Sequence, residues 1–146
     1  MSLSVGDVAP EFSLPDQDRQ VVSLADLRGT PVLLVYYPFA FSRICTGELC
    51  QLRDELATYT DAGVRVLALS TDPAPALKAW REQEGFDFPL LSDFWPHGST
   101  AQAYGAVHLA VVVTAFLLIP AGAPVYFVLA AVELVLFATA LRSCLS

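Results

Sequence analysis

Residues 32–50 read VLLVYYPFAFSRICTGELC, and the rest of the chain can be interpreted from this stretch. It opens with a continuous apolar run over 32–37, which is typical of a strand buried on both faces of a parallel sheet. Pro38 ends the run, and beyond a short loop Leu49 and Leu52 recur at helical spacing. The stretch therefore predicts a strand, a loop and a helix in succession, as in an α/β fold.

The flanking sequence predicts more elements of the same kind. Strands and helices alternate along it, which implies right-handed crossovers and parallel central strands. The expected elements are a hairpin within 11–24, a helix over 46–62 closed by Gly63, a strand over 64–70, a helix from Asp72-Pro73 (N-cap and first position) to Gly85, a strand over 88–92 and a short helix over 99–104.

The composition changes sharply at Gly105. The chain of 146 residues is 55% hydrophobic, and we expect it to form a single domain over 1–146. Residues 106–146 contain 31 apolar residues in 41 and only two charges, Glu133 and Arg142, whereas residues 1–105 have the composition of an ordinary acidic protein. The C-terminal part is thus atypical and strongly apolar.

Charge and ligand spacing exclude several classes of function. The net charge of −7 comes from the first 105 residues, without the clustered Lys and Arg that nucleic acid binding requires. His97 and His108 are isolated, and the three cysteines show no paired ligand spacing, so no metal site is predicted. No basic segment followed by an apolar run opens the chain, so we expect a cytoplasmic protein.

The candidate chemistry lies where the strand over 32–37 gives way to the helix. Cys45 falls in or just before the first helical turn, where free backbone N–H groups favour a thiolate, the nucleophilic form. Arg43 adds a nearby cation, Ser42 offers a hydroxyl to an incoming oxygen, and Pro38 can exclude water without adding an N–H group. For Cys45 alone, the alternative is a buried and inert cysteine.

The string Pro38, Ser42, Cys45 has the PxxxSxxC form of the peroxiredoxin active-site loop. With FPLLSDFWPHG (88–98) and AQAYG (101–105), residues 1–105 resemble the one-cysteine peroxiredoxins of the alkyl-hydroperoxide-reductase-E-like group. The resemblance implies a thioredoxin-like fold and a thiol-specific peroxidase that needs no metal, haem or flavin.

The resemblance also implies roles and partners. Cys45 would attack hydrogen peroxide or an organic hydroperoxide and become a sulfenic acid, with Pro38 shielding it and Ser42 donating a hydrogen bond. Glu48 matches a glutamate that holds the family's active-site arginine. The reductant would be a thioredoxin, a mycoredoxin or a low-molecular-weight thiol, and in the family the neighbourhood of 86–95 borders subunit contacts, which makes a homodimer an option.

Cys50 adds a second resemblance, because Cys45-xxxx-Cys50 is the spacing of Q-type (bacterioferritin-comigratory) peroxiredoxins. In that group the second cysteine resolves the sulfenic acid as a disulfide. Five residues along an ideal helix rise by about 7.5 Å, beyond the usual disulfide span of about 4.4–6.8 Å between Cα atoms. The helix would have to unwind; alternatively, Cys50 is a small apolar filler beside Leu49 and Leu52.

The sequence departs from the family after AQAYG. Peroxiredoxins place an arginine from a later strand beside the reactive sulfur, and this chain has none between Gly105 and Leu141. Arg43 is the nearby candidate for a substitute, and its alternative is a solvated loop cation. The alternative to a peroxidase is a catalytically impaired thioredoxin-like protein that lacks the family's arginine, with membrane tethering by its tail as an option.

Three interpretations of the tail remain open. In the first, 107–119, a turn at 120–124 and 125–132 form the hairpin that completes the sheet, and 134–141 forms the last helix. In the second, the same apolar segment is a membrane hairpin; its arm of about 13 residues falls short of the spanning range of about 17–25, and its arm of about 17 residues, which contains Glu133, only reaches it. In the third, a shifted reading frame produced residues 106–146.

Overall fold

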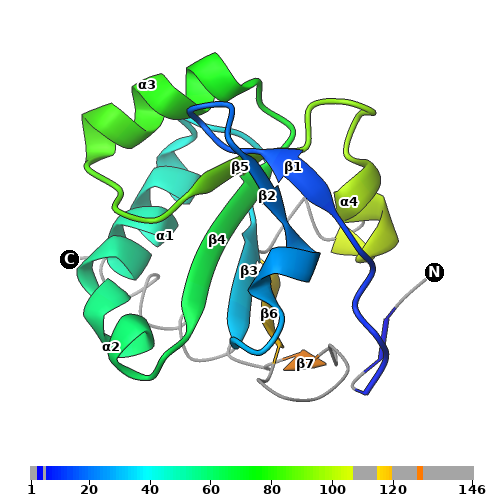
Figure 1. The fold of residues 1–146 in the computed structure, drawn as a ribbon. Helices are drawn as coiled ribbons and strands as arrows, with labels where there is room; N and C mark the ends of the chain where they lie inside the picture. The colour runs from blue at the N-terminus through cyan, green and yellow to red at the C-terminus, as the bar shows by residue number, and fades with distance from the viewer. Residues whose placement is uncertain (1–2, 5, 107–114, 120–127, 130–146) are drawn as a thin grey trace.

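The computed structural model of the protein describes residues 3–4, 6–106, 115–119 and 128–129. Their elements follow one another as strands and helices in alternation (Figure 1). In chain order they are β1 (Ser13–Pro15), β2 (Val21–Ser23), the 3-10 helix η1 (Leu24–Leu27), β3 (Val32–Tyr36), α1 (Arg43–Asp54), α2 (Leu56–Asp61), β4 (Arg65–Ser70), α3 (Ala74–Glu84), β5 (Leu90–Ser92), α4 (Ser99–Ala103), β6 (Ala115–Ile119) and β7 (Val128–Leu129).

The central sheet has five strands in the order β5-β4-β3-β6-β7. β3 is parallel to β4, and β4 is parallel to β5. This confirms the expected α/β class with parallel central strands, joined by α1 and α2 in one crossover and by α3 in the next. The separate hairpin of β1 and β2 also lies where the sequence places it.

The strands β6 and β7 extend the sheet on the far side of β3. β6 is antiparallel to β3, with Leu34 opposite Leu117, and β7 is antiparallel to β6. The two strands fall in the two arms of the expected C-terminal hairpin. The rest of those arms and the helix expected over 134–141 lie outside the described residues. Within the part of the chain that the structure describes, no helix is long and apolar enough to cross a membrane.

Burial on both faces explains the continuous apolar run of β3. Leu34 and its alternate neighbours pack into one buried cluster with β1, η1 and Tyr104, while Leu33, Val35 and the following Tyr37 pack into another. The second cluster is covered by α1 and α3, which lie together on one side of the sheet in Figure 1. A strand covered twice has no polar face to show in its sequence.

The single helix expected over 46–62 is wrong. The structure has two helices, α1 and α2, and α1 begins at Arg43, three residues earlier than expected. The break is at Glu55, whose backbone has a ψ of 2° and leaves the helical conformation. No glycine or proline marks the position, so local sequence gave no signal for it.

The expected role of Asp72 as an N-cap is also wrong. Pro73 is the N-cap residue of α3, and the helix begins at Ala74. The Asp72 carboxylate instead accepts hydrogen bonds from the backbone N–H of Ala40 and the hydroxyl of Ser70. The carboxylate that the local sequence pattern assigned to the start of α3 thus binds the backbone of Ala40, which is distant in sequence.

Candidate active site

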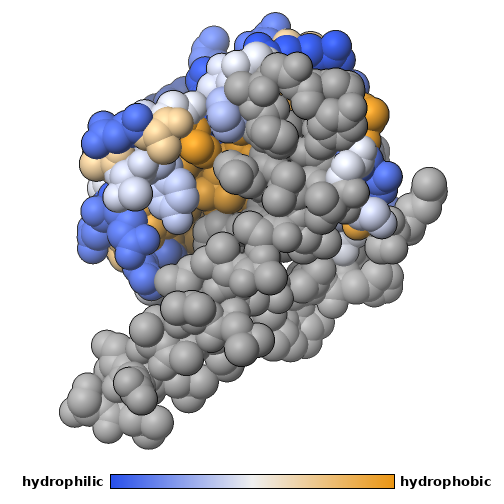
Figure 2. All heavy atoms as spheres, turned by 90° about the horizontal axis from the view of Figure 1, so that it is seen from below, coloured by the Kyte–Doolittle hydropathy of each residue, from blue (hydrophilic) through white to orange (hydrophobic). Residues whose placement is uncertain are grey.

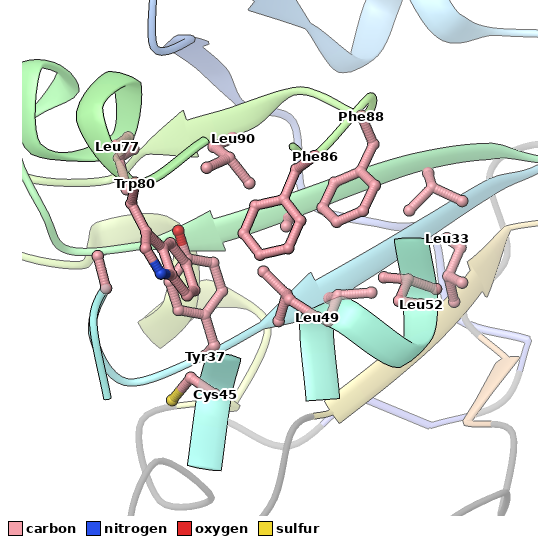
Figure 3. Packing of buried hydrophobic residues seen from close by; sticks show 14 residues of the cluster. Leu33, Tyr37, Cys45, Leu49, Leu52, Leu77, Trp80, Phe86, Phe88 and Leu90 are labelled. Carbon is pink, nitrogen blue, oxygen red and sulfur yellow. The ribbon is translucent and has the colours of Figure 1, made fainter. Parts of the chain in front are cut away.

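Cys45 lies in the first turn of α1, as expected from the sequence. Its side chain is only 2% exposed and belongs to the buried cluster that includes Tyr37 and Leu49. Figure 3 shows Cys45 beside Tyr37 at the edge of this cluster, with its sulfur pointing away from the aromatic rings. The first N–H groups of a helix have no partner within the helix, and the buried Cys45 lies in this first turn.

The loop before α1 is held by a long-range hydrogen bond. The Ala40 N–H donates to Asp72 Oδ2 at 2.7 Å, and Ser70 Oγ donates to the same oxygen at 2.8 Å. Ser92 Oγ in turn donates to the backbone oxygen of Asp72 at 2.6 Å. The ends of β4 and β5 therefore fix the loop that carries Pro38 and Ser42. Sequence reasoning missed Asp72 in this role.

Phe41 fixes the same loop by a different contact. Its φ of 63° lies in the left-handed region, which is uncommon for a residue with a side chain. Its ring centroid is 6.1 Å from that of Trp80 on α3. The loop thus turns sharply just before Ser42 and is supported from α3.

Ser42 is the N-cap residue of α1, yet its hydroxyl does not cap the helix. Its backbone is extended, and its carbonyl oxygen accepts from the Thr46 N–H at 2.8 Å. Ser42 and Pro38 are both partly exposed, three residues before Cys45 and seven before it respectively. The hydroxyl is therefore free of the capping bond that serine usually makes at this position.

Arg43 and Glu48 lie on α1 with Cys45. Arg43 is its first residue and is exposed, whereas Glu48 is partly buried. Residues two apart on a helix do not face each other, so the placement of Arg43 relative to the buried Cys45 favours the interpretation that it is a solvated cation. The segment in which the family's arginine is expected lies mostly outside the described residues.

Cys50 is partly buried on α1, and both it and Cys45 are free thiols. Its Sγ donates to Glu84 Oε2 at 3.8 Å, at the end of α3. Burial raises the pKa of the Cys50 thiol; the cation of Arg53 opposes this, and the Glu84 carboxylate adds to it. Because α1 is an intact helix from Cys45 to Cys50, the two sulfurs are separated in this state.

Two buried aromatic residues behind Cys45 carry polar atoms. Tyr37 and Trp80 are 4% and 0% exposed, and their ring centroids are 5.2 Å apart. Trp80 Nε1 has no hydrogen-bond partner among the described residues, whereas the Ser70 side chain interacts with the Tyr37 hydroxyl. Burial raises the pKa of Tyr37 far above its ordinary value. Sequence periodicity placed both residues in the core but gave no sign of these polar atoms.

No group of three or more His, Cys, Asp or Glu side chains within the described ranges is placed to hold a metal ion. The reactive groups described above are the thiols of Cys45 and Cys50 and the hydroxyl of Ser42.

Comparison with known proteins agrees with this arrangement. Residues 5–131 match the AhpC/TSA family. Over 104 residues the chain is 54% identical to alkyl hydroperoxide reductase E of Mycobacterium tuberculosis. The matched segment covers 70% of this chain and 68% of that protein. It is 47% identical over 91 residues to peroxiredoxin Bcp of Escherichia coli, covering 62% of this chain and 58% of that protein.

Solved structures of peroxiredoxins have the same fold as this chain. The structure of peroxiredoxin Q from Xanthomonas campestris superposes with a TM-score of 0.74 at 20% identity, covering 98% of this chain and 94% of that one. The fold is thus the thioredoxin-like fold of peroxiredoxins, and the protein is a peroxiredoxin, a thiol-dependent peroxidase that takes hydroperoxide substrates and a thiol reductant. Within that class, the chain belongs to the AhpC/TSA family.

Proposed function

We propose that Cys45 is the residue that reduces the peroxide. Its thiolate attacks one oxygen of hydrogen peroxide or an organic hydroperoxide; a sulfur–oxygen bond forms, the oxygen–oxygen bond breaks, and water or an alcohol leaves with a proton. Cys45 is left as a sulfenic acid. The observation that carries the proposal is the place of this sulfur, shielded in the first turn of α1 behind the loop from Pro38 to Ser42.

The neighbouring residues have supporting roles in this proposal. Pro38 shields the site from water without adding an N–H group. The hydroxyl of Ser42, which makes no capping bond to α1, donates to a peroxide oxygen. Glu48, partly buried on α1, corresponds to the glutamate that helps to hold the active-site arginine in the family. If Arg43 replaces the missing arginine, Arg43→Ala slows the oxidation of Cys45 at least tenfold; its exposed position leads us to expect a rate within about twofold of the wild type.

We further propose that Cys50 resolves the sulfenic acid. The Cys50 sulfur forms a bond to the Cys45 sulfur, and the sulfenic oxygen leaves as water. An external dithiol, or two molecules of a monothiol, later reduces the disulfide with two electrons and is itself oxidised to a disulfide. A thioredoxin, a mycoredoxin or a low-molecular-weight thiol fits this step. The intact α1 between the two cysteines means that its first turns unwind before the disulfide closes.

One equivalent of hydrogen peroxide tests both steps. Intact-mass analysis is expected to show a loss of two hydrogens in the wild type and a persistent sulfenic acid in Cys50→Ser. Cys45→Ser is expected to show neither change, and Cys144→Ser serves as the matched control that behaves like the wild type. A wild-type Cys45 that reacts no faster than free cysteine would support the catalytically impaired alternative instead.

The proposed assembly is a homodimer in the cytoplasm, in which each subunit is a single domain over 1–146. Several large apolar side chains are exposed, and Figure 2, which views the molecule from below, shows hydrophobic surface (orange) beside hydrophilic residues (blue) on that face. The large apolar side chains that are exposed among the described residues are Val8, Val21, Phe39, Phe41, Ile44, Phe94 and Trp95. Such surface favours an interface. Sedimentation velocity is expected to give twice the mass of 15.7 kDa, and a monomer would refute the assembly.

A further inference from the structure

Glu84, the last residue of α3, contacts α1 at two points. Its Oε2 accepts from Cys50 Sγ at 3.8 Å, and its backbone oxygen accepts from Arg53 Nη1 at 2.5 Å. Its other carboxylate oxygen, Oε1, accepts from Gln83 Nε2 at 2.8 Å. The carboxylate is thus oriented by its neighbour and directed at the Cys50 thiol.

These contacts hold only one end of α1. The Arg53 bond lies one turn beyond Cys50, whereas at the other end the N-cap residue Ser42 makes no side-chain cap. When α1 unwinds to bring the two sulfurs together, the end that carries Cys50 is therefore the end that stays against α3. Glu84 consequently remains beside Cys50 while the disulfide forms.

The charges around Cys50 favour the neutral thiol. Burial disfavours the thiolate, and the carboxylates of Glu84 and, more weakly, Asp54 act in the same direction, while the Arg53 cation opposes them. Glu84 is the one of these acidic groups that also contacts the sulfur. Since the thiolate is the form that attacks a sulfenic acid, this environment slows the attack.

We propose that Glu84 delays the resolving step by holding Cys50 as a neutral thiol, which lengthens the life of the Cys45 sulfenic acid and lets external thiols compete for it. The proposal rests on the proposed function of Cys50. Glu84 is a positioning residue: it gains and loses no electrons, and the bonds formed and broken are those of the resolving reaction already described.

Glu84→Gln tests the proposal, with Glu82→Gln as the matched control, because Glu82 is an exposed glutamate on the same helix. The first measurement is alkylation of Cys50 by iodoacetamide across pH in the Cys45→Ser background, read by peptide mass spectrometry. We expect Glu84→Gln to move the alkylation profile to lower pH, and Glu82→Gln to leave it in place. A purely structural role for Glu84 would not move this profile.

The second measurement follows disulfide formation after a rapid peroxide pulse in proteins that retain Cys45. In Glu84→Gln we expect this phase to be about two- to threefold faster near neutral pH, because the gain in thiolate exceeds the accompanying loss of nucleophilicity. Oxidation of Cys45 itself is expected to keep its wild-type rate. Glu84→Asp, which restores the charge, is expected to return the slower phase.

The outcomes distinguish the role of Glu84 from the resolving role of Cys50. A normal disulfide with an unmoved alkylation profile, or with a slower phase in Glu84→Gln, would overturn the role of Glu84 and leave the proposed function standing. A wild type that never forms the disulfide would refute the resolving role of Cys50, and the delay with it.

Discussion

Replacement of Asp72 is expected to loosen the active-site loop without touching the reactive sulfur. The Asp72 carboxylate accepts from the Ala40 N–H at 2.7 Å and from Ser70 Oγ at 2.8 Å, across 32 residues of chain in the first case. Hydrogen bonds to a charged acceptor contribute about 1.5–3 kcal/mol, and a donor left unsatisfied on partial burial adds to the cost. Asp72 therefore supplies the hydrogen-bonded support of the loop between Pro38 and Ser42, beside the contact of Phe41 with Trp80.

Two variants separate the contribution of charge from that of the acceptor. Asp72→Ala removes the acceptor, and we expect it to lower the free energy of unfolding by about 2–3 kcal/mol. Asp72→Asn keeps an oxygen that can accept from Ala40 but loses the charge, so its expected loss is about 1 kcal/mol. Urea unfolding followed by tryptophan fluorescence measures both, with Asp87→Ala, at an exposed position, as the control.

The same variants are expected to slow the oxidation of Cys45. A displaced loop moves the groups that orient the peroxide, and small misplacements cost up to about 100-fold in rate; we expect about tenfold for Asp72→Ala and less for Asp72→Asn. Stopped-flow measurement of thiol loss gives the rates. If Asp72→Ala loses stability yet oxidises at the wild-type rate, other contacts hold the loop and the reasoning fails.

Three further predictions concern the core. Tyr36→Phe is expected to raise the free energy of unfolding by about 1 kcal/mol, because it removes a buried hydroxyl that has no hydrogen-bond partner among the described residues; an unfolding midpoint below the wild type would contradict this. Leu49→Ala, at 0% exposure, is expected to cost about 2–5 kcal/mol in urea unfolding. Burial raises the pKa values of Tyr36, Tyr37 and Tyr104 above those in the unfolded chain, so the unfolded chain loses these phenol protons at lower pH. The free energy of unfolding is therefore expected to be unaffected by these groups below about pH 10 and to fall as pH rises beyond it. Circular dichroism across pH measures this.

Local pattern was sufficient for much of the fold and for the candidate nucleophile. The apolar run over 32–37 predicted a strand covered on both faces, and β3 packs into two clusters because alternate side chains enter opposite faces. Cys45 was expected at the start of a helix because Pro38 stops the strand and helical spacing begins soon after it. Each of these conclusions depends on residues a few positions apart.

Contacts between distant segments set the rest. The break at Glu55 has no glycine or proline to mark it, the Asp72 carboxylate binds a loop rather than the start of α3, and Glu84 meets Cys50 across 34 residues. Periodicity and capping preferences describe how a segment satisfies its own backbone, and they carry no information about which remote group will compete for it. The order of residues thus specifies the sheet and the place of the reactive cysteine, whereas the loop geometry and the surroundings of Cys50 arise when the chain packs and partners far apart in sequence come within hydrogen-bond distance.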